Sequence, residues 1–275
     1  MKFFEWLLKI DRRIIFIVIG IIVIISFFIR LSLPMSHTDP VKKIYQYVEA
    51  LPAESCVIVS VDFDPGSAPE LQPMMKAFLR HCFRKKIKVV MIALVPQGAG
   101  LGEIVIKSVA EEFGAKAETD YVNLGWKGGG PVAVILGMAD SITDIYPKNF
   151  AGKPTKYMPL FRKVKNYNDI SLIATFAASA TPDAWVVYAY TKYKKKIAAG
   201  VTAVMAADYY PYLNTGQFIG LINGLKGAAE YEDMVGKPED ATCRMTPQAF
   251  IHLTIIFFII VGNIGYFALR KKKTS

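Results

Sequence analysis

Hydrophobic residues gather at the two ends of the chain. Residues 14–33 and 250–269 are almost continuously apolar, whereas apolar and polar positions are mixed between them. Each segment is about twenty residues long, the length that an α-helix needs to cross ~30 Å of hydrocarbon. Because backbone polar groups in lipid are satisfied mainly within a helix, the pattern predicts transmembrane helices at residues 14–33 and 249–269. They enclose a folded domain of residues 34–248.

The basic residues beside these segments predict the side of the membrane. Lys2, Lys9, Arg12 and Arg13 precede the first segment, and the basic run 270–273 follows the second. Such flanks stay preferentially in the cytoplasm. We therefore expect a two-pass cell-membrane protein with cytoplasmic tails, 1–13 and 270–275, and an extracytoplasmic domain. The alternatives are a cleaved signal peptide for the first segment, which its length and poor cleavage site disfavour, and a buried core helix for the second.

Inside the domain, short apolar runs rich in β-branched residues alternate with amphipathic stretches. We expect strands at residues 56–62, 88–95, 170–176 and 197–206, and helices at residues 70–86, 101–113, 182–195 and 215–234. An earlier helix begins near Pro40, with Thr38 or Asp39 as its cap. This alternation predicts an α/β domain with a Rossmann-like or flavodoxin-like, mostly parallel sheet that is covered by helices on both faces.

Residues 118–168 interrupt the alternation, because glycine, proline, lysine and tyrosine are frequent there. We expect a short helix near residues 131–145 and an irregular loop at residues 144–157. Binding surfaces concentrate on loops that a rigid scaffold positions, so this segment is expected to hold much of the recognition surface.

Net charge reflects the membrane topology more than it indicates a nucleic-acid partner. The chain carries +10, of which the N-terminal tail contributes +2 and the C-terminal tail +4, leaving +4 for the rest. The basic tails favour anionic lipid headgroups. The sequence has no zinc knuckle, RNA-recognition signature or basic and aromatic stripe, so we expect membrane lipid and other membrane proteins as partners, and no nucleic acid.

Two carboxylates stand where the first predicted strand ends. Asp62 and Asp64 precede the helix that follows. Ligands of open α/β sheets bind beyond the carboxyl ends of the strands, and paired carboxylates are suited to a divalent cation that carries phosphate oxygens. In the alternative interpretation, Asp64 closes the turn and Asp62 pairs with a neighbouring cation or backbone amide.

A glycine-rich loop and one further carboxylate complete the candidate ligand site. Consecutive backbone amides at Gly128 and Gly129 could face an anion, and Lys127 would add a positive charge. Asp208 follows the last predicted strand. The loop spacing matches neither of the common phosphate-binding motifs, so a flexible loop or a close crossing of helices is the alternative.

Small residues recur every fourth position along the last predicted helix, at Gly216, Gly220, Gly224 and Ala228. Glycine costs ~1 kcal/mol relative to alanine inside a helix, so this spacing predicts a compensating close approach. The partner is either the sheet of the same domain or another subunit.

The sequence shows no recognisable catalytic set, no histidine metal site and no cofactor motif. There is no nucleophile elbow and no metal-ligand spacing among the three histidines. Cys56, Cys82 and Cys243 allow one disulfide with one thiol left over, although Cys56 lies in an apolar run that is typical of a buried thiol.

Several stretches resemble a family of uncharacterised prokaryotic membrane proteins. They are residues 121–125, 200–205, 209–216, 224–231 and 262–264. The resemblance implies two anchors around one α/β domain and implies no activity. In architecture alone, the arrangement is also similar to the extracytoplasmic domain of gliding-motility auxiliary transporter components; fold by itself does not fix function.

We therefore expect a doubly anchored module with a structural or assembly role, oligomeric or part of a larger membrane complex. One alternative is a membrane-tethered enzyme that acts on a phosphorylated or nucleotide-linked substrate at Asp62, Asp64 and Lys127. Another is a solute-binding accessory of a transporter that uses Trp126, Tyr209 and Tyr210.

Overall fold

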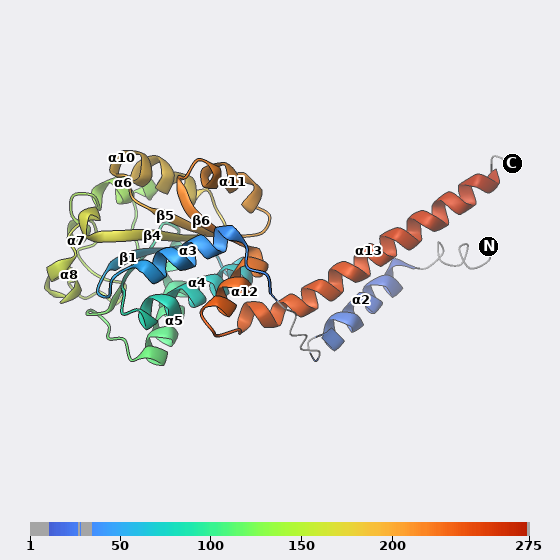
Figure 1. The fold of residues 1–275 in the computed structure, drawn as a ribbon, viewed down its shortest axis with the longest axis horizontal. Helices are drawn as coiled ribbons and strands as arrows, with labels where there is room; N and C mark the ends of the chain where they lie inside the picture. Colours follow the sequence, from blue (N-terminus) through green and yellow to red (C-terminus); the bar gives the residue numbers. More distant parts are fainter. Residues whose placement is uncertain (1–10, 27, 29–34, 274–275) are drawn as a thin grey trace. The chain divides into compact units, whose positions relative to one another are not determined.

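The computed structural model describes residues 11–26, 28 and 35–273 (Figure 1). Its contacts divide the chain into two compact units. One is the folded domain, Met35–Ala241, and the other combines the described parts of the two chain ends.

The domain is built on six parallel strands in the order β3-β2-β1-β4-β5-β6. Their bounds are β1 Cys56–Asp62, β2 Lys88–Ala93, β3 Tyr121–Trp126, β4 Ile170–Ala177, β5 Ile197–Val201 and β6 Phe218–Asn223. Every residue of β1 is buried, because helices cover both faces of the sheet. The predicted Rossmann-like α/β fold is confirmed, with the strand order reversing between β1 and β4.

Four helices cover one face of the sheet: α3 Asp39–Ala50, α4 Ala68–Arg84, α5 Pro96–Phe113 and α12 Gly224–Met234. In Figure 1, α3, α4 and α12 lie together, and α12 packs against both α4 and β6. Phe78 of α4 meets Phe176 of β4 edge to face, with ring centroids 5.7 Å apart. The amphipathic pattern of α4 thus places its apolar side against the sheet.

Shorter elements cover the opposite face. They are α6 Gly130–Gly137, α7 Ile142–Ile145, η1 Thr155–Tyr157, α8 Leu160–Lys163, η2 Tyr167–Asp169, α9 Thr181–Ala184, the π-helical turn η3 Trp185–Tyr190, α10 Thr191–Tyr193 and α11 Ala206–Asn214. Trp185 is fully buried in the core of this face, together with Ile58 of β1. The expected short helix near residues 131–145 is present as α6 and α7, with a turn between them.

Two predictions about secondary structure were wrong. Residues 121–126 belong to the segment 118–168 that we expected to interrupt the alternation, but they form the edge strand β3. Residues 218–223, expected inside a helix, form the opposite edge strand β6. The four-residue spacing of glycines suggested a helical period. However, Gly216 and Gly224 have φ values of +75° and +59°, and they lie on either side of β6, where the chain changes direction.

The predicted small-residue face therefore does not exist on one helix. Gly216 lies in a turn, Gly220 in β6, and Gly224 and Ala228 in α12. A close approach is present at Gly220, where a Cβ atom would lie 2.3 Å from the carbonyl oxygen of Pro40 and 2.5 Å from Ile44. This contact lies within the domain, between β6 and α3. A contact of these residues with another subunit stays a prediction.

The second unit contains α2 Arg12–Ser26 and most of α13 Asp240–Lys273. Residues Asp240–Ile264 of α13 have a mean hydropathy of 1.8 and are long and apolar enough to cross a membrane, by length and composition alone. It is the one such span found among the described residues. The predicted N-terminal span, residues 14–33, includes residues 27 and 29–33, which lie outside the described residues.

Two of the three cysteines are buried. Cys56 is 2% exposed and Cys82 is fully buried, whereas Cys243 is exposed. All three are free thiols in the structure. The expectation that Cys56 serves as a small buried apolar residue is confirmed.

The contact at Gly220 predicts a stability difference between two glycine substitutions. Gly220→Ala should lower the free energy of unfolding by about 1–3 kcal/mol, because the added methyl group overpacks the β6–α3 contact. Gly100→Ala in α5 is the matched control, since nothing lies within 4 Å of its Cβ position; it should be neutral or stabilising by up to ~1 kcal/mol. Denaturant unfolding of the detergent-solubilised chain measures both. Equal stability of the two variants would contradict the described packing.

Candidate functional site

The carboxyl edge of the sheet is the place where the fold favours a ligand. Strand order reverses between β1 and β4, and open α/β sheets bind ligands in the crevice beyond such a switch point. Asp62 is the last residue of β1 and is 1% exposed. The sequence therefore located this carboxylate correctly, at the carboxyl end of the first strand.

Asp62 is occupied by partners from its own and neighbouring strands. Its Oδ2 accepts hydrogen bonds from the hydroxyls of Ser60 at 2.6 Å and Thr175 at 3.2 Å, and its Oδ1 accepts from the Leu94 N–H at 2.7 Å. These groups come from β1, from β4 and from the residue that follows β2. Asp62 thus ties three adjacent strands together at the switch point.

Burial governs the ionisation of Asp62. Removal of water from the carboxylate raises the pKa of Asp62 to about 6, although the hydrogen bonds from Ser60 and Leu94 act in the opposite direction. Near neutral pH the carboxylate is ionised and its charge is spread over three donors. Below about pH 6 it gains a proton.

Asp64 closes the turn that leads into α4. Its Oδ1 accepts hydrogen bonds from the Ser67 backbone N–H at 2.9 Å and from the Ser67 hydroxyl at 2.7 Å. The Ser67 hydroxyl is the largest cause that lowers the pKa of Asp64. The alternative interpretation of Asp64 as a turn residue is confirmed. Among the described residues, no group of three or more histidine, cysteine, aspartate or glutamate side chains could hold a metal ion.

The glycine-rich loop lies on the same edge but away from Asp62. Trp126 pairs with Ala93, so Lys127, Gly128 and Gly129 follow β3 beside the end of β2. Because β2 separates β3 from β1, the backbones of these strands are roughly 10 Å apart. All three loop residues are exposed. The structure shows no contact that joins Lys127 to Asp62 or Asp64.

Asp208 is exposed, whereas part of the expected aromatic surface is buried. Asp208 is exposed on α11, whereas Tyr209 beside it is 2% exposed and belongs to the core. The hydroxyls of Tyr209 and Tyr212 donate to Asp183 at 3.1 Å and 2.7 Å. Tyr209 therefore cannot contribute to an exposed solute-binding surface, in contrast to our expectation.

A polar network that the sequence analysis missed holds the chain where it enters the domain. Glu230 of α12 is 1% exposed, and its Oε2 accepts hydrogen bonds from the backbone N–H of Thr38 at 2.8 Å and from the Thr38 hydroxyl at 2.7 Å. His37 also meets Asp233 of α12 at 2.7 Å. Thr38 holds the N-cap position of α3, as expected, but its hydroxyl bonds to Glu230 instead of to the first turn of the helix.

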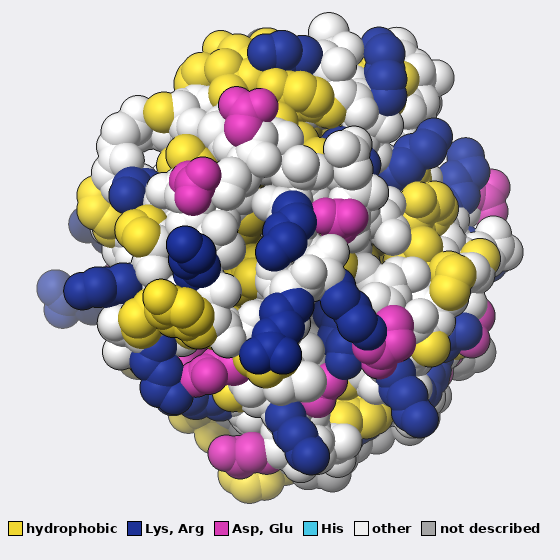
Figure 2. Space-filling model, turned by 90° about the vertical axis from the view of Figure 1, so that its left-hand side faces the viewer, with side chains coloured by type: hydrophobic (Ala, Val, Ile, Leu, Met, Phe, Trp, Pro, Cys, Tyr) yellow, Lys and Arg dark blue, Asp and Glu magenta, His cyan; other side chains and the backbone are white. Residues whose placement is uncertain are grey.

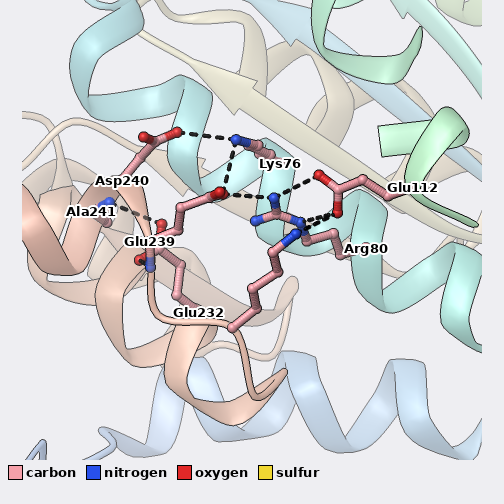
Figure 3. A network of polar contacts seen from close by, with 8 residues as sticks. Lys76, Arg80, Glu112, Glu232, Glu239, Asp240 and Ala241 are labelled. Carbon is pink, nitrogen blue, oxygen red and sulfur yellow. Dashed lines mark hydrogen bonds and ion pairs between the residues drawn. The ribbon is translucent and has the colours of Figure 1, made fainter. Parts of the chain in front are cut away.

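The same helix holds the chain where it leaves the domain. Glu232, also 1% exposed, accepts the backbone N–H of Glu239 through Oε2 and that of Ala241 through Oε1, both at 2.9 Å (Figure 3). These donors lie at the start of α13, where a carboxylate satisfies N–H groups that have no helical partner. We call the contacts of Glu230, Glu232 and Asp233 with residues 37–38 and 239–241 the α12 junction.

Ion pairs with α4 and α5 reinforce the exit side of the junction. Arg80 of α4 is 3% exposed and binds Glu112 of α5 through two parallel hydrogen bonds of 2.9 Å and 2.8 Å. Its Nη2 also lies 2.6 Å from Glu239, which meets Lys76 at 2.9 Å (Figure 3). The hydrogen bond from Arg80 is the main reason that the pKa of Glu112 falls to about 2.

A buried histidine joins α12 to α3 and α4. His81 is fully buried, and its ring nitrogens lie 2.9 Å from the Tyr231 hydroxyl and 2.8 Å from Glu49. Tyr45 stacks on its ring at 4.4 Å. Burial lowers the pKa of His81 to about 4, so the ring is neutral at physiological pH. Its geometry is that of a packing contact.

The junction had a weak signal in the sequence. The acidic run of Glu230, Glu232 and Asp233 interrupts a segment rich in glycine and alanine, and Arg80 interrupts the apolar stretch of α4. Neither feature indicates which residues these charged side chains contact, because the contacting residues lie far away in the sequence.

Comparison with known proteins gives no relative: no protein-family model, no curated protein and no solved structure matches the chain. The family resemblance drawn from the sequence stays a prediction.

Asp62 predicts a pH-dependent contribution to stability. The native state holds its proton up to about pH 6, whereas an unfolded aspartate loses it near pH 3.8. Between these values the native state binds more protons, so the contribution of Asp62 to the free energy of unfolding falls as pH rises, by at most about 3 kcal/mol. Relative to Asp62→Asn, the unmodified chain should therefore lose stability from pH 4 to pH 6.5 in denaturant titrations.

Asp64→Asn is the matched control, because the Asp64 carboxylate is exposed and its pKa is lowered. It should not reproduce the decline between pH 4 and pH 6.5. A stability difference between Asp62→Asn and the unmodified chain that is constant over this range would contradict the burial of an ionised carboxylate at the switch point.

Proposed function

We propose that the chain is a membrane-anchored α/β module whose domain lies outside the cytoplasm and acts by assembly, with copies of itself or with other membrane proteins. The supporting observation is α13, which begins in the polar network of the domain and continues as the apolar span Asp240–Ile264. A helix of this length and composition is suited to lipid.

The α12 junction fits an anchoring role. It fixes Thr38 at the start of the domain and the first residues of α13 to one helix through buried carboxylates. Buried carboxylates are costly to leave unpaired, so both attachments are coupled to the packing of the domain. An anchored module needs such coupling if its domain is to remain folded when its ends are held.

The contacts of the two carboxylates disfavour the rival enzymatic hypothesis. The carboxylate oxygens of Asp62 and Asp64 are engaged by Ser60, Leu94 and Ser67, and no contact brings Lys127 to them. The solute-binding hypothesis loses Tyr209 to the core. The assembly role is therefore the function that we propose.

Cysteine labelling and mass measurement test the proposal together. In a Cys243→Ser background, Lys163→Cys should react with an impermeant maleimide on intact cells, because Lys163 is 82% exposed on the domain. Ser275→Cys should react only after the cells are lysed. After extraction in mild detergent, the particle should exceed one 30.6 kDa chain, through self-association or a co-purified membrane protein.

Tyr167→Cys is the matched control for labelling, because that side chain is 2% exposed and should stay unreactive until the domain unfolds. Labelling of Ser275→Cys but not of Lys163→Cys on intact cells would place the domain in the cytoplasm and overturn the proposed topology. A lone monomer without a partner, extracted under several mild conditions, would overturn the assembly role.

A further inference from the structure

The amino edge of the sheet carries a row of lysines. Parallel strands begin on one edge, and lysines stand just before or at the start of four of the six strands: Lys86 and Lys88 at β2, Lys116 before β3, Lys163 and Lys165 before β4, and Lys194, Lys195 and Lys196 before β5. We call this set the lysine row. Figure 2 views the side of the molecule on which α7 and α8 lie in Figure 1, and dark blue side chains are spread across it.

Contacts between these residues show that the row is continuous across the sheet. Lys88 meets Glu54 at 3.1 Å and Asp120 at 2.6 Å, which joins the starts of β1, β2 and β3. Lys163 lies 3.8 Å from the same Glu54. The Lys195 ammonium donates to the Ile170 carbonyl at the start of β4. Lysines distant in the sequence are thus neighbours along this edge.

The acidic residues on this edge are already engaged. Asp120 binds Lys88 and accepts the backbone N–H of Lys116 at 2.7 Å. Asp169 accepts the backbone N–H of Lys165 at 2.7 Å. In the part of the chain that the structure describes, no carboxylate lies within ion-pair distance of the remaining lysines, which are Lys86, Lys116, Lys165, Lys194, Lys195 and Lys196.

Helix dipoles do not account for the excess of positive charge. Helices that follow parallel strands end near the amino edge, and each C-terminus carries about half a negative charge. The ends of α3, α4, α5 and α10 together would supply roughly two negative charges. The six unpaired lysines exceed this. Lys165 and Lys195 each donate to a backbone carbonyl, that of Phe161 and that of Ile170. An ammonium group has three donors, so all six lysines keep donors for an anion from outside.

The shape of the row favours an elongated partner. Four strand intervals separate β3 from β5, so the row extends over roughly 19 Å. The neighbouring hollow, lined by Glu54, Lys88 and Lys163 among others, has a volume of only about 140 Å³. The charges are therefore distributed along a line and do not converge on one small ligand.

The chemistry of the row disfavours a folded protein as its partner. The apolar residues between the lysines are buried, with Ile87 at 1%, Ile170 at 3% and Ile197 at 0% exposure. Stable protein interfaces need a desolvated centre of large apolar or aromatic side chains. Lysine is a compact point charge that needs no fixed ligand plane, which suits repeated anionic groups in varied orientations.

We propose that the lysine row binds a flexible linear polyanion, a polymer that carries phosphate or carboxylate groups along its length. This surface is separate from the carboxyl edge, and it is also separate from the point where the chain enters the domain. α3 runs from Gly220 in β6, beside Pro40, to the start of β4, where the Tyr47 hydroxyl donates to the Ser171 carbonyl. The chain thus enters the domain at the end of α3 remote from the row.

Binding of the full-length, detergent-solubilised chain to labelled long-chain polyphosphate tests the proposal. The affinity should fall steeply with salt, because bound lysines release counterions, with a slope of log K against log salt near −4 for six contacts. The variant Lys86→Gln, Lys116→Gln, Lys196→Gln removes three of the six unpaired ammonium groups, one beside each of three strands. It should bind at least about tenfold more weakly at low salt, with a slope smaller by about 2.

Lys42→Gln, Lys43→Gln, Lys107→Gln is the matched control. It removes the same formal charge from exposed positions on α3 and α5 and should change the affinity less than twofold. Circular dichroism checks that both variants fold. Equal loss of affinity in the two variants, or no loss in the first, would overturn the proposal.

Further arms distinguish the source of the anion. Polyglutamate should compete with polyphosphate, and orthophosphate at equal phosphate concentration should not. Single-stranded DNA should bind no more tightly than polyphosphate of equal charge, because lysine charges, and not base stacking, carry the proposed binding. Tight, base-dependent DNA binding would overturn the proposal. Vesicles of anionic lipid that bind through the same three lysines, with no polymer binding, would also overturn it in favour of a membrane surface.

Discussion

Two buried carboxylates on α12 are the constraint on which the rest of the domain depends. Glu230 and Glu232 point to opposite ends of the folded chain, one to Thr38 and the other to the start of α13. A carboxylate taken out of water must be hydrogen-bonded or paired, and removal of one partner of a buried charge costs about 3–5 kcal/mol. The two ends of the domain are therefore held by the same interactions that let α12 pack.

The packing of α12 depends on the edge strand β6. α12 follows β6, and β6 admits α3 at close range because Gly220 has no side chain. α3 is then near enough for Thr38 and Tyr45 to reach α12 and the His81 ring. Arg80 extends the arrangement to α5 through Glu112. Polar contacts thus join α3, α4, α5 and α12, the helices that cover this face of the apolar core.

The two edges of the sheet have different chemistry. At the carboxyl edge, the carboxylates of Asp62 and Asp64 are hydrogen-bonded to residues of the domain itself. At the amino edge, lysines remain after Glu54, Asp120 and Asp169 have been engaged. The row of lysines therefore lies at the edge that such folds seldom use for a ligand.

The sequence predicted the central strands and not the edges. β1, β2, β4 and β5 are apolar runs that helices cover on both sides, so their composition alone reveals them. β3 contains Asn123 and Gly125, so its sequence is typical of a loop. β6 contains Gly220, whose four-residue spacing from other glycines suggested a helix. Asp62 and Asp64 were located correctly because they follow a clear strand. The partners of Glu230 and Glu232 could not be predicted, because they depend on contacts between distant parts of the chain.

Hydrogen exchange of the full-length chain in detergent tests the central claim most directly. If the α12 junction holds both ends, the amides of Thr38 and Ala241 should exchange slowly, with protection close to that of β1. Glu230→Ala should release Thr38, and Glu232→Ala should release Ala241, each with exchange at least about tenfold faster. Exchange of both amides at the rate of frayed chain ends in the unmodified protein would contradict the account.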